Sequence, residues 1–129
     1  MAKEPAKRVL VADDAGLVRL YYREALEAAG YVVDEALNGL EALEKLLLNP
    51  ADLVVVDVNM PQMDGFTFLK ALRAQAAPLC ATPALVISTE AKPQDFAVAL
   101  AAGANFYLVK PVSREVLTQY ADLMCGTRA

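Results

Sequence analysis

Short apolar runs alternate with amphipathic stretches along most of this chain, and this alternation constrains its fold more than any other feature. The runs are rich in β-branched residues, and the stretches between them place apolar side chains at helical spacing. We expect strands at residues 8–12, 31–36, 53–58, 84–88 and 106–110, and helices at 17–29, 40–48, 65–76, 94–102 and 114–124. Five repeats of strand and helix, joined by right-handed crossovers, predict an α/β protein with an open, doubly wound parallel sheet.

Local signals mark several of the expected helix ends. Gly30 and Gly103 are placed as helix stops, and Pro93 is placed as a helix start. Asn38, followed three residues later by Glu41, resembles a capping box in which asparagine replaces the usual serine or threonine. These signals support the helical interpretation of the stretches that they bound.

The size and charge of the chain exclude several classes of function. Its 129 residues suffice for one domain with a buried core, and no Gly/Ser-rich linker divides it. The net charge of -4 opposes binding to a nucleic-acid backbone. No apolar run reaches the roughly 20 residues of a membrane span, and the first residues lack the apolar stretch of a secretion signal. We therefore expect a cytoplasmic protein that binds neither nucleic acid nor membrane.

The chain contains no histidine, and this restricts its chemistry. Nucleophile systems that need an imidazole base are excluded, as are histidine metal sites and phosphohistidine carriers. Cys80 and Cys125 lie far apart without CxxC spacing, so we expect two reduced thiols rather than a disulfide or a metal site. Any chemistry must come from carboxylates, hydroxyls and lysine.

Polar residues stand at the ends of four of the five expected strands. They are Asp13 and Asp14, Asp57, Ser88 and Thr89, and Lys110 with Pro111. In an open parallel sheet, ligands bind beyond the carboxyl ends of the strands, so these side chains should converge at one edge. Each of them alone is also explained as a helix cap or a turn former. Crowded carboxylates, however, raise one another's pKa unless a cation joins them, so together they predict a metal site.

Oxygen ligands without histidine or thiolate indicate a hard divalent cation, and a few carboxylates are typical of Mg²⁺. Magnesium suggests phosphate chemistry, because a carboxylate can attack phosphorus when a metal and a lysine neutralise the phosphoryl oxygens. On this interpretation Asp57 is the nucleophile. Asp13 and Asp14 hold the cation. Lys110 and Ser88 bind the phosphoryl group.

These motifs, in this order, resemble the receiver domain of two-component response regulators, and in particular the single-domain, CheY-like chemotaxis regulators. The resemblance rests on DD at 13–14, DVNMPQMDG at 57–65, the serine and threonine at 88–89 and the Lys-Pro pair at 110–111. It implies a flavodoxin-like fold with five helices and a five-stranded parallel sheet in the order 2-1-3-4-5. It also implies a receiver domain at 8–125, preceded by a flexible tail at 1–7.

The resemblance further implies a phosphorelay function. A sensor histidine kinase would donate a phosphoryl group to Asp57. Magnesium would be bound by Asp14, Asp57 and the backbone carbonyl of Asn59, with Asp13 acting largely through water. Lys110 falls on the family's phosphoryl contact. We expect the protein to catalyse only its own phosphorylation and dephosphorylation, rather than to act as an enzyme on other molecules.

Ser88 and Tyr107 fall on the positions of the family's switch residues. Phosphorylation would draw Ser88 inward and Tyr107 would follow, which changes the face formed by the fourth helix, the fifth strand and the fifth helix. Serine lacks the methyl group that restricts the commoner threonine, so we expect looser switching. Gly16 replaces a usual helix cap, so the first helix should begin less firmly. The peptide bond before Pro111 is expected to be cis.

We expect an output protein to bind this face, because the chain ends at Ala129, directly after the last helix, without an attached DNA-binding or enzymatic domain. In CheY-like regulators that partner is the flagellar motor switch, which is our first expectation. A stand-alone phosphorelay intermediate or phosphate sink, and a receiver cut from a longer regulator, are the alternatives. A metal-dependent hydrolase and a receiver that is never phosphorylated represent other classes of function.

Overall fold

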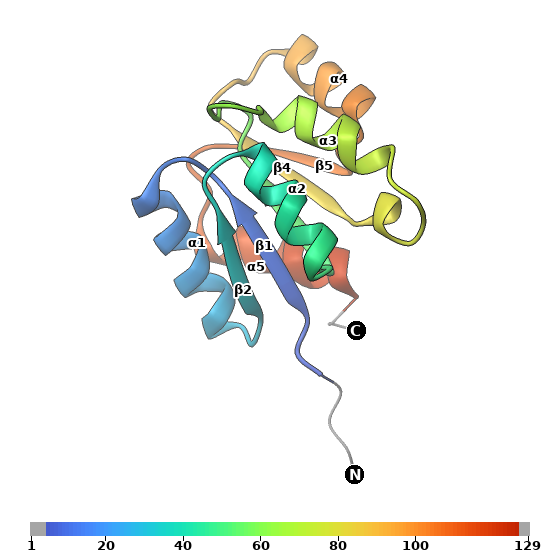
Figure 1. Ribbon diagram of the computed structural model, residues 1–129. Coiled ribbons are helices and arrows are strands. Elements are labelled where there is room, and N and C mark those ends of the chain that lie inside the picture. Colours follow the sequence, from blue (N-terminus) through green and yellow to red (C-terminus); the bar gives the residue numbers. More distant parts are fainter. Residues whose placement is uncertain (1–4, 127–129) are drawn as a thin grey trace.

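The computed structural model describes residues 5–126, in which five strands and five α-helices alternate along the chain (Figure 1). The strands are β1 (Arg8–Ala12), β2 (Val32–Ala36), β3 (Leu53–Val56), β4 (Ala84–Ser88) and β5 (Phe106–Val109). The helices are α1 (Gly16–Ala28), α2 (Gly39–Leu48), α3 (Gly65–Arg73), α4 (Pro93–Ala102) and α5 (Arg114–Cys125), with a short 3-10 helix, η1 (Leu79–Ala81). None of these helices is long and apolar enough to cross a membrane.

The strands form one parallel sheet in the order β2-β1-β3-β4-β5, which confirms the predicted fold. The chain moves outward from β1 to β2 and then returns across β1 to β3. The carboxyl ends of β1 and β3 are therefore neighbours at the point where the winding reverses. Their register pairs Ala12 with Val56, so Asp13 and Asp57, which come next in each strand's direction, start from adjacent positions.

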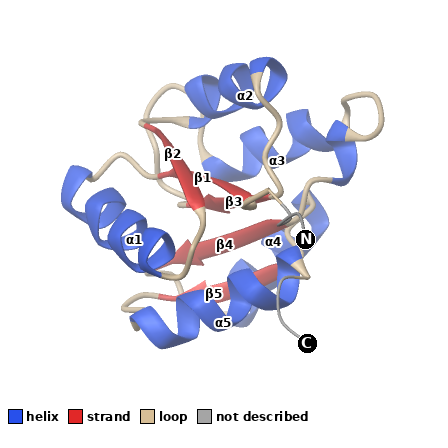
Figure 2. Cartoon of the chain, turned by 90° about the horizontal axis from the view of Figure 1, so that it is seen from below, coloured by secondary structure: helices blue, strands red, loops and turns tan. Residues whose placement is uncertain are grey.

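Helices cover both faces of the sheet, as a doubly wound fold requires (Figure 2). One face packs against α1 and α5, through a cluster that includes Val11, Leu26, Val55, Ile87 and Leu117. The other face packs against α2, α3 and α4, through a cluster that includes Leu46, Val54, Val86, Phe68 and Leu72. Every residue of β3 and β4 is buried, which explains why these runs are almost entirely apolar.

Most helix ends follow the local signals in the sequence. The side chain of Asn38 accepts a hydrogen bond of 2.8 Å from the backbone N–H of Glu41, as predicted. Glu41 in turn accepts from Leu37, one residue before the cap. Pro93 is the first residue of α4, and Gly103 ends that helix with a φ of 117°, in the left-handed region that favours glycine.

Some predicted boundaries were wrong. Helix α3 ends at Arg73 rather than at residue 76, because Pro78 disfavours a helical conformation in the residue before it and the chain turns into η1. Strand β3 ends at Val56 rather than at residue 58, so Asp57 lies in the loop that follows it. Strand β5 likewise ends one residue before Lys110.

Two further predictions concern the termini and the cysteines. Residues 1–4 of the predicted tail lie outside the described residues, whereas Lys7 accepts a hydrogen bond of 3.0 Å from the backbone of Val32. Cys80 and Cys125 form no disulfide with each other and are both partly buried.

Candidate functional site

Three carboxylates meet beyond the carboxyl ends of β1 and β3. Each of Asp13, Asp14 and Asp57 offers an oxygen, and these oxygens lie within 4.8 Å of one another. Asp13 is 2% exposed and Asp57 is 8% exposed, whereas Asp14 faces solvent. The strand register explains the meeting of residues that stand 44 positions apart, since β1 and β3 are direct neighbours.

One lysine balances part of this negative charge. The Nζ of Lys110 lies 3.1 Å from Oδ2 of Asp13 and 3.4 Å from Oδ1 of Asp57. Its backbone N–H donates to the carbonyl of Ser88 over 2.8 Å, which anchors the end of β5 to β4. Three carboxylates beside one ammonium leave about two negative charges, so the site matches a divalent cation in both charge and ligand type.

The pKa values reflect this crowding. Burial and the charge of Asp13 raise the pKa of Asp57 above its usual range, while Lys110 acts in the opposite direction. Burial lowers the pKa of Lys110, but its hydrogen bond to Asp13 and the charges of Asp13 and Asp57 outweigh this effect and raise the pKa. The lysine is therefore held as an ammonium ion beside a carboxylate that is poorly solvated.

Ser88 ends β4 beside these groups and is fully buried. Its Oγ accepts a hydrogen bond of 3.1 Å from the backbone N–H of Glu90. Because the Ser88 oxygen is the acceptor in this contact, its hydroxyl can still donate a hydrogen bond to another group. Thr89, the next residue, is exposed.

Tyr107 is tied to the same loop. Its hydroxyl donates to the carbonyl of Glu90 over 2.8 Å, and its ring meets that of Phe96 edge to face, with 4.6 Å between the centroids. Glu90 therefore connects the hydroxyl of Ser88, through its N–H, to the phenol of Tyr107, through its carbonyl. The peptide bond between Lys110 and Pro111 is cis, as expected.

The loop after Asp57 owes its shape to residues whose role the sequence did not reveal. A Cβ atom on Gly65 would lie only 2.3 Å from the carbonyl oxygen of Asp57, so this position requires glycine. The side chain of Asp64 caps α3 by accepting from the N–H of Thr67 over 2.8 Å. Asn59, the predicted carbonyl ligand, lies in this loop with its side chain exposed.

Sequence reasoning also missed two residues of α1. Arg19 donates to the backbone carbonyl of Asp13 over 2.7 Å. Tyr22 is buried below the site, and burial together with the charges of Asp13 and Asp57 raises the pKa of its phenol. Tyr22 was visible as part of an apolar helical stripe, but nothing in its sequence context indicated that it approaches the carboxylates.

An apolar groove opens beside Lys110, between α1 and the loop that joins β5 to α5. It is lined by Leu17, Val18, Tyr21, Tyr22, Thr89, Lys110, Pro111 and Val112. Leu17, at the start of α1, is 83% exposed. The groove reaches the same edge of the sheet as the carboxylates.

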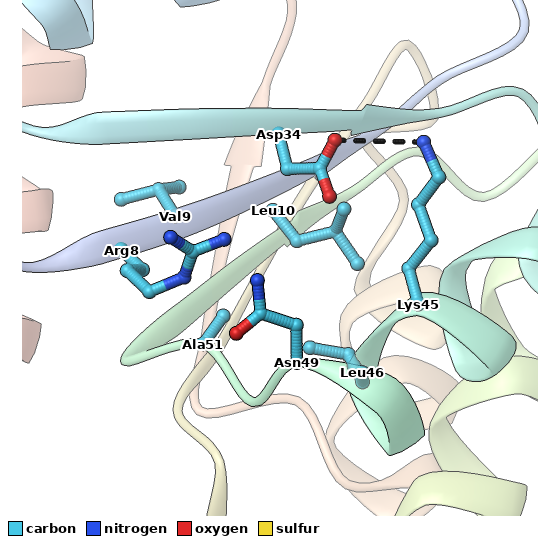
Figure 3. Close-up of a pocket in the computed structure, with 8 residues that line it drawn as sticks. All are labelled: Arg8, Val9, Leu10, Asp34, Lys45, Leu46, Asn49 and Ala51. Atoms are coloured by element: carbon cyan, nitrogen blue, oxygen red, sulfur yellow. Dashed lines mark hydrogen bonds and ion pairs between the residues drawn. The ribbon is translucent and has the colours of Figure 1, made fainter.

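A second cavity is too small to be a ligand site. It lies between β1, β2 and α2, where the ammonium of Lys45 is 3.5 Å from Asp34 (Figure 3). The Nε of Arg8 is buried there and has no hydrogen-bond partner among residues 5–126. Its free volume is about 10 Å³, close to the lower limit for a single water molecule. None of the predicted site residues lines it.

Comparison with known proteins identifies the family. The family model that describes the response regulator receiver domain matches residues 9–122, and the chain belongs to that family. Receiver domains are the phosphoacceptors of two-component signalling, and they interact with histidine kinases and output proteins.

Relatives and solved structures support this assignment. The gliding motility regulatory protein of Myxococcus xanthus is 39% identical over 116 residues, which are 89% of this chain and 15% of that protein. The sensor protein EvgS of Escherichia coli is 38% identical over 109 residues, 84% of this chain and 9% of EvgS. The chain thus spans only a small part of the length of these two curated relatives.

Two solved structures show the same fold. The chemotaxis response regulator CheY4 of Vibrio cholerae is 38% identical with a TM-score of 0.87, and the match covers 93% of this chain and 99% of CheY4. A Francisella response regulator receiver domain is 30% identical with a TM-score of 0.87, covering 94% and 98% of the two chains.

Proposed function

We propose that this protein is a phosphorylation-controlled switch in which Asp57 accepts a phosphoryl group from a phosphohistidine of a sensor kinase. The observation that carries this proposal is the meeting of three carboxylates within 4.8 Å, with the ammonium of Lys110 bonded to two of them. Burial of a carboxylate costs free energy, yet two of these three carboxylates are buried, at the point where the winding of the sheet reverses and where such folds bind ligands. A cluster of surface carboxylates without a function would not require this cost.

The residues present fit Mg²⁺. We assign Asp14, Asp57 and the backbone carbonyl of Asn59 as its protein ligands, and Asp13 as a residue that acts through bound water. When bound, the ion supplies positive charge for the phosphoryl oxygens. The donor set consists of oxygens only, and the site's excess of about two negative charges supports a divalent ion.

The chain's own residues then perform the transfer. A carboxylate oxygen of Asp57 attacks phosphorus, the new O–P bond forms, and the P–N bond of the donor breaks with its electron pair remaining on the imidazole nitrogen. Lys110 neutralises a phosphoryl oxygen, and the Ser88 hydroxyl donates to another. The protein thereby changes only its own phosphorylation state.

The switch follows from the contacts of Glu90. A phosphoryl group adds a charge of roughly -2, which attracts the hydroxyl of Ser88 away from the N–H of Glu90. The carbonyl of Glu90 holds the phenol of Tyr107, so displacement of this loop moves the tyrosine. Tyr107 contacts Phe96 on α4, and the movement therefore changes the α4–β5–α5 face.

An output protein binds that face. The α4–β5–α5 face carries apolar side chains that are at least 36% exposed, namely Phe96, Leu100, Phe106, Val109 and Leu123. The similarity to a chemotaxis response regulator supports the flagellar motor switch as the partner. The greater length of the curated relatives supports the alternatives of a phosphorelay intermediate, a phosphate sink, or a receiver within a longer regulator. The cytoplasmic location and the receiver boundaries at 8–125 stay predictions.

The phosphodonor experiment tests the proposal. The protein is incubated with Mg²⁺ and acetyl phosphate, and its intact mass is measured. We expect a gain of one phosphoryl group that disappears in Asp57→Asn and after chelation of the metal. Phosphate release without an adduct would instead indicate a hydrolase, and no reaction at all would indicate a receiver that is never phosphorylated.

A second measurement separates the output partners. Phosphorylated and unmodified protein are compared in a pull-down with the motor switch protein and with a histidine phosphotransfer protein. We expect phosphorylation to increase binding to the motor switch protein. Transfer of the phosphoryl group to the phosphotransfer protein, without such binding, would favour the relay function.

A further inference from the structure

Arg19 links the loop that carries the first two site aspartates to a neighbouring strand. Its Nη1 donates to the backbone carbonyl of Asp13 over 2.7 Å, and its Nε donates to Oε1 of Glu35 over 2.8 Å. Glu35 belongs to β2, so one guanidinium from α1 joins the β1–α1 loop to β2. The Arg19 side chain is only 14% exposed, which makes these contacts stronger than those of a surface ion pair.

The carbonyl that Arg19 holds belongs to the peptide unit between Asp13 and Asp14. Because a peptide unit is planar, fixing its oxygen also fixes the direction in which the chain enters Asp14. Three other contacts hold Asp13: its N–H donates to Ala36 over 3.1 Å, its Oδ1 accepts from the N–H of Ala15 over 2.9 Å, and its Oδ2 accepts from Lys110 over 3.1 Å. Asp14 is exposed, so its placement depends on its backbone more than on packing.

We propose that Arg19, oriented by Glu35, is a positioning residue that holds Asp13 and Asp14 in the arrangement that binds the cation. This inference rests on the proposed Mg²⁺ site. It assigns Arg19 no contact with the metal or the phosphoryl group. Its effect passes through the backbone carbonyl of Asp13.

The electrostatic effect of Arg19 has the opposite sign to its positioning effect. A positive charge near a cation site weakens cation binding, so removal of the charge alone would strengthen Mg²⁺ binding. Loss of the hydrogen bond to the Asp13 carbonyl would weaken it, because the carboxylates lose their fixed geometry. The sign of the change in affinity therefore decides between the two roles.

Arg23 provides a matched control on the same helix. Its Nε donates to Oε2 of Glu35 over 2.6 Å and its Nη1 donates to Glu27 over 3.0 Å. It thus shares the carboxylate of Glu35 with Arg19, but its hydrogen bonds lead away from the Asp13 loop. Arg23→Gln removes the same charge as Arg19→Gln and leaves the loop contact in place.

The test is a calorimetric titration of the full chain with MgCl₂, for the wild type, Arg19→Gln, Arg19→Lys and Arg23→Gln, with thermal unfolding of each variant alongside. We expect Arg19→Gln to raise the Kd for Mg²⁺ about 10-fold, as is typical when the partner of a ligand residue is lost. Arg19→Lys keeps the charge but loses the planar fork, and should raise the Kd by a smaller factor. Arg23→Gln should change it by less than about twofold, through screened charge alone.

The outcomes separate this inference from the proposed function. A wild-type protein that does not bind Mg²⁺ refutes the proposed metal site and this inference with it. A wild-type protein that binds Mg²⁺, with an unchanged or lower Kd in Arg19→Gln, refutes only the positioning role. Equal weakening by Arg19→Gln and Arg23→Gln also refutes it. If Arg19→Gln does not fold, Arg19→Lys decides: a raised Kd supports the inference and an unchanged Kd overturns it.

Discussion

Replacement of Gly65 by alanine tests whether the close approach between α3 and Asp57 shapes the site. Gly65 is the first residue of α3 and is buried. Helix propensity alone would favour alanine over glycine by up to about 1 kcal/mol. An added Cβ, however, would lie 2.3 Å from the carbonyl oxygen of Asp57 and 3.0 Å from Cγ1 of Val56. Since the first contact is with backbone, the helix and the loop must move apart.

Overpacking of this kind costs about 1–3 kcal/mol. After the gain in helix propensity, we expect Gly65→Ala to lower the free energy of unfolding by up to roughly 2 kcal/mol. For a chain of this size this lowers Tm on the order of 5 °C. Urea unfolding followed by circular dichroism measures the free energy. The displaced backbone belongs to Asp57, so the rate of phosphorylation by acetyl phosphate should fall as well.

Gly16→Ala is the matched control. Gly16 is the first residue of α1 and not, as the sequence suggested, its cap; the N-cap is Ala15, which forms no side-chain cap hydrogen bond. A Cβ on Gly16 would meet its nearest neighbour, the guanidinium of Arg19, at an ordinary 3.6 Å. We expect this variant to be as stable as the wild type or slightly more stable. Equal stability of Gly65→Ala and Gly16→Ala would contradict the steric reasoning, because helix propensity would then account for both.

Three further predictions concern single side chains. Burial raises the pKa of Glu35, but the hydrogen bonds from two arginines of α1 outweigh this and hold it below the usual value. The carboxylate therefore stabilises the fold above the unfolded pKa and loses this effect as the pH falls, so the destabilisation by Glu35→Gln in urea unfolding should shrink between pH 7 and pH 3; a constant difference would contradict this. Burial raises the pKa of Cys125 to about 11, so its alkylation by iodoacetamide at pH 8, followed by mass, should be slow until the protein is unfolded; equally rapid alkylation of the folded protein would refute this. Tyr107→Phe loses the hydrogen bond to Glu90 and should cost about 1 kcal/mol of stability. It should also reduce phosphorylation-dependent partner binding in the pull-down while leaving the rate of phosphorylation unchanged; a slower rate would indicate a role in the transfer itself.

The fold could be predicted because its signals are local. Apolar runs with β-branched residues identified all five strands, and Asn38, Pro93 and Gly103 marked helix ends through interactions with their immediate neighbours. The error at the end of β3 arose because that boundary depends on a distant contact. The run at 53–58 is apolar beyond Val56, but the chain leaves the sheet there and approaches α3.

The residues of the site also fall into two groups, those whose contacts could be predicted from the sequence and those whose contacts could not. The meeting of Asp13 with Asp57 could be predicted, because parallel strands bring their carboxyl ends to one edge whatever the details of packing. The contacts of Arg19 and Gly65 could not be predicted from residue spacing. Each depends on the angle at which a helix crosses the sheet, and no sequence period reports that angle.

The sheet separates two apolar layers, one shared by α1 and α5 and the other by α2, α3 and α4. Leu26 and Leu72 belong to different layers. The losses in free energy of unfolding caused by Leu26→Ala and Leu72→Ala should therefore be additive in the double variant. Each layer can consequently accumulate changes in evolution without requiring compensation in the other. The helices on one face of the sheet can therefore change to bind a new partner protein, while the carboxylates of Asp13, Asp14 and Asp57, which follow strands shared by both layers, keep their positions.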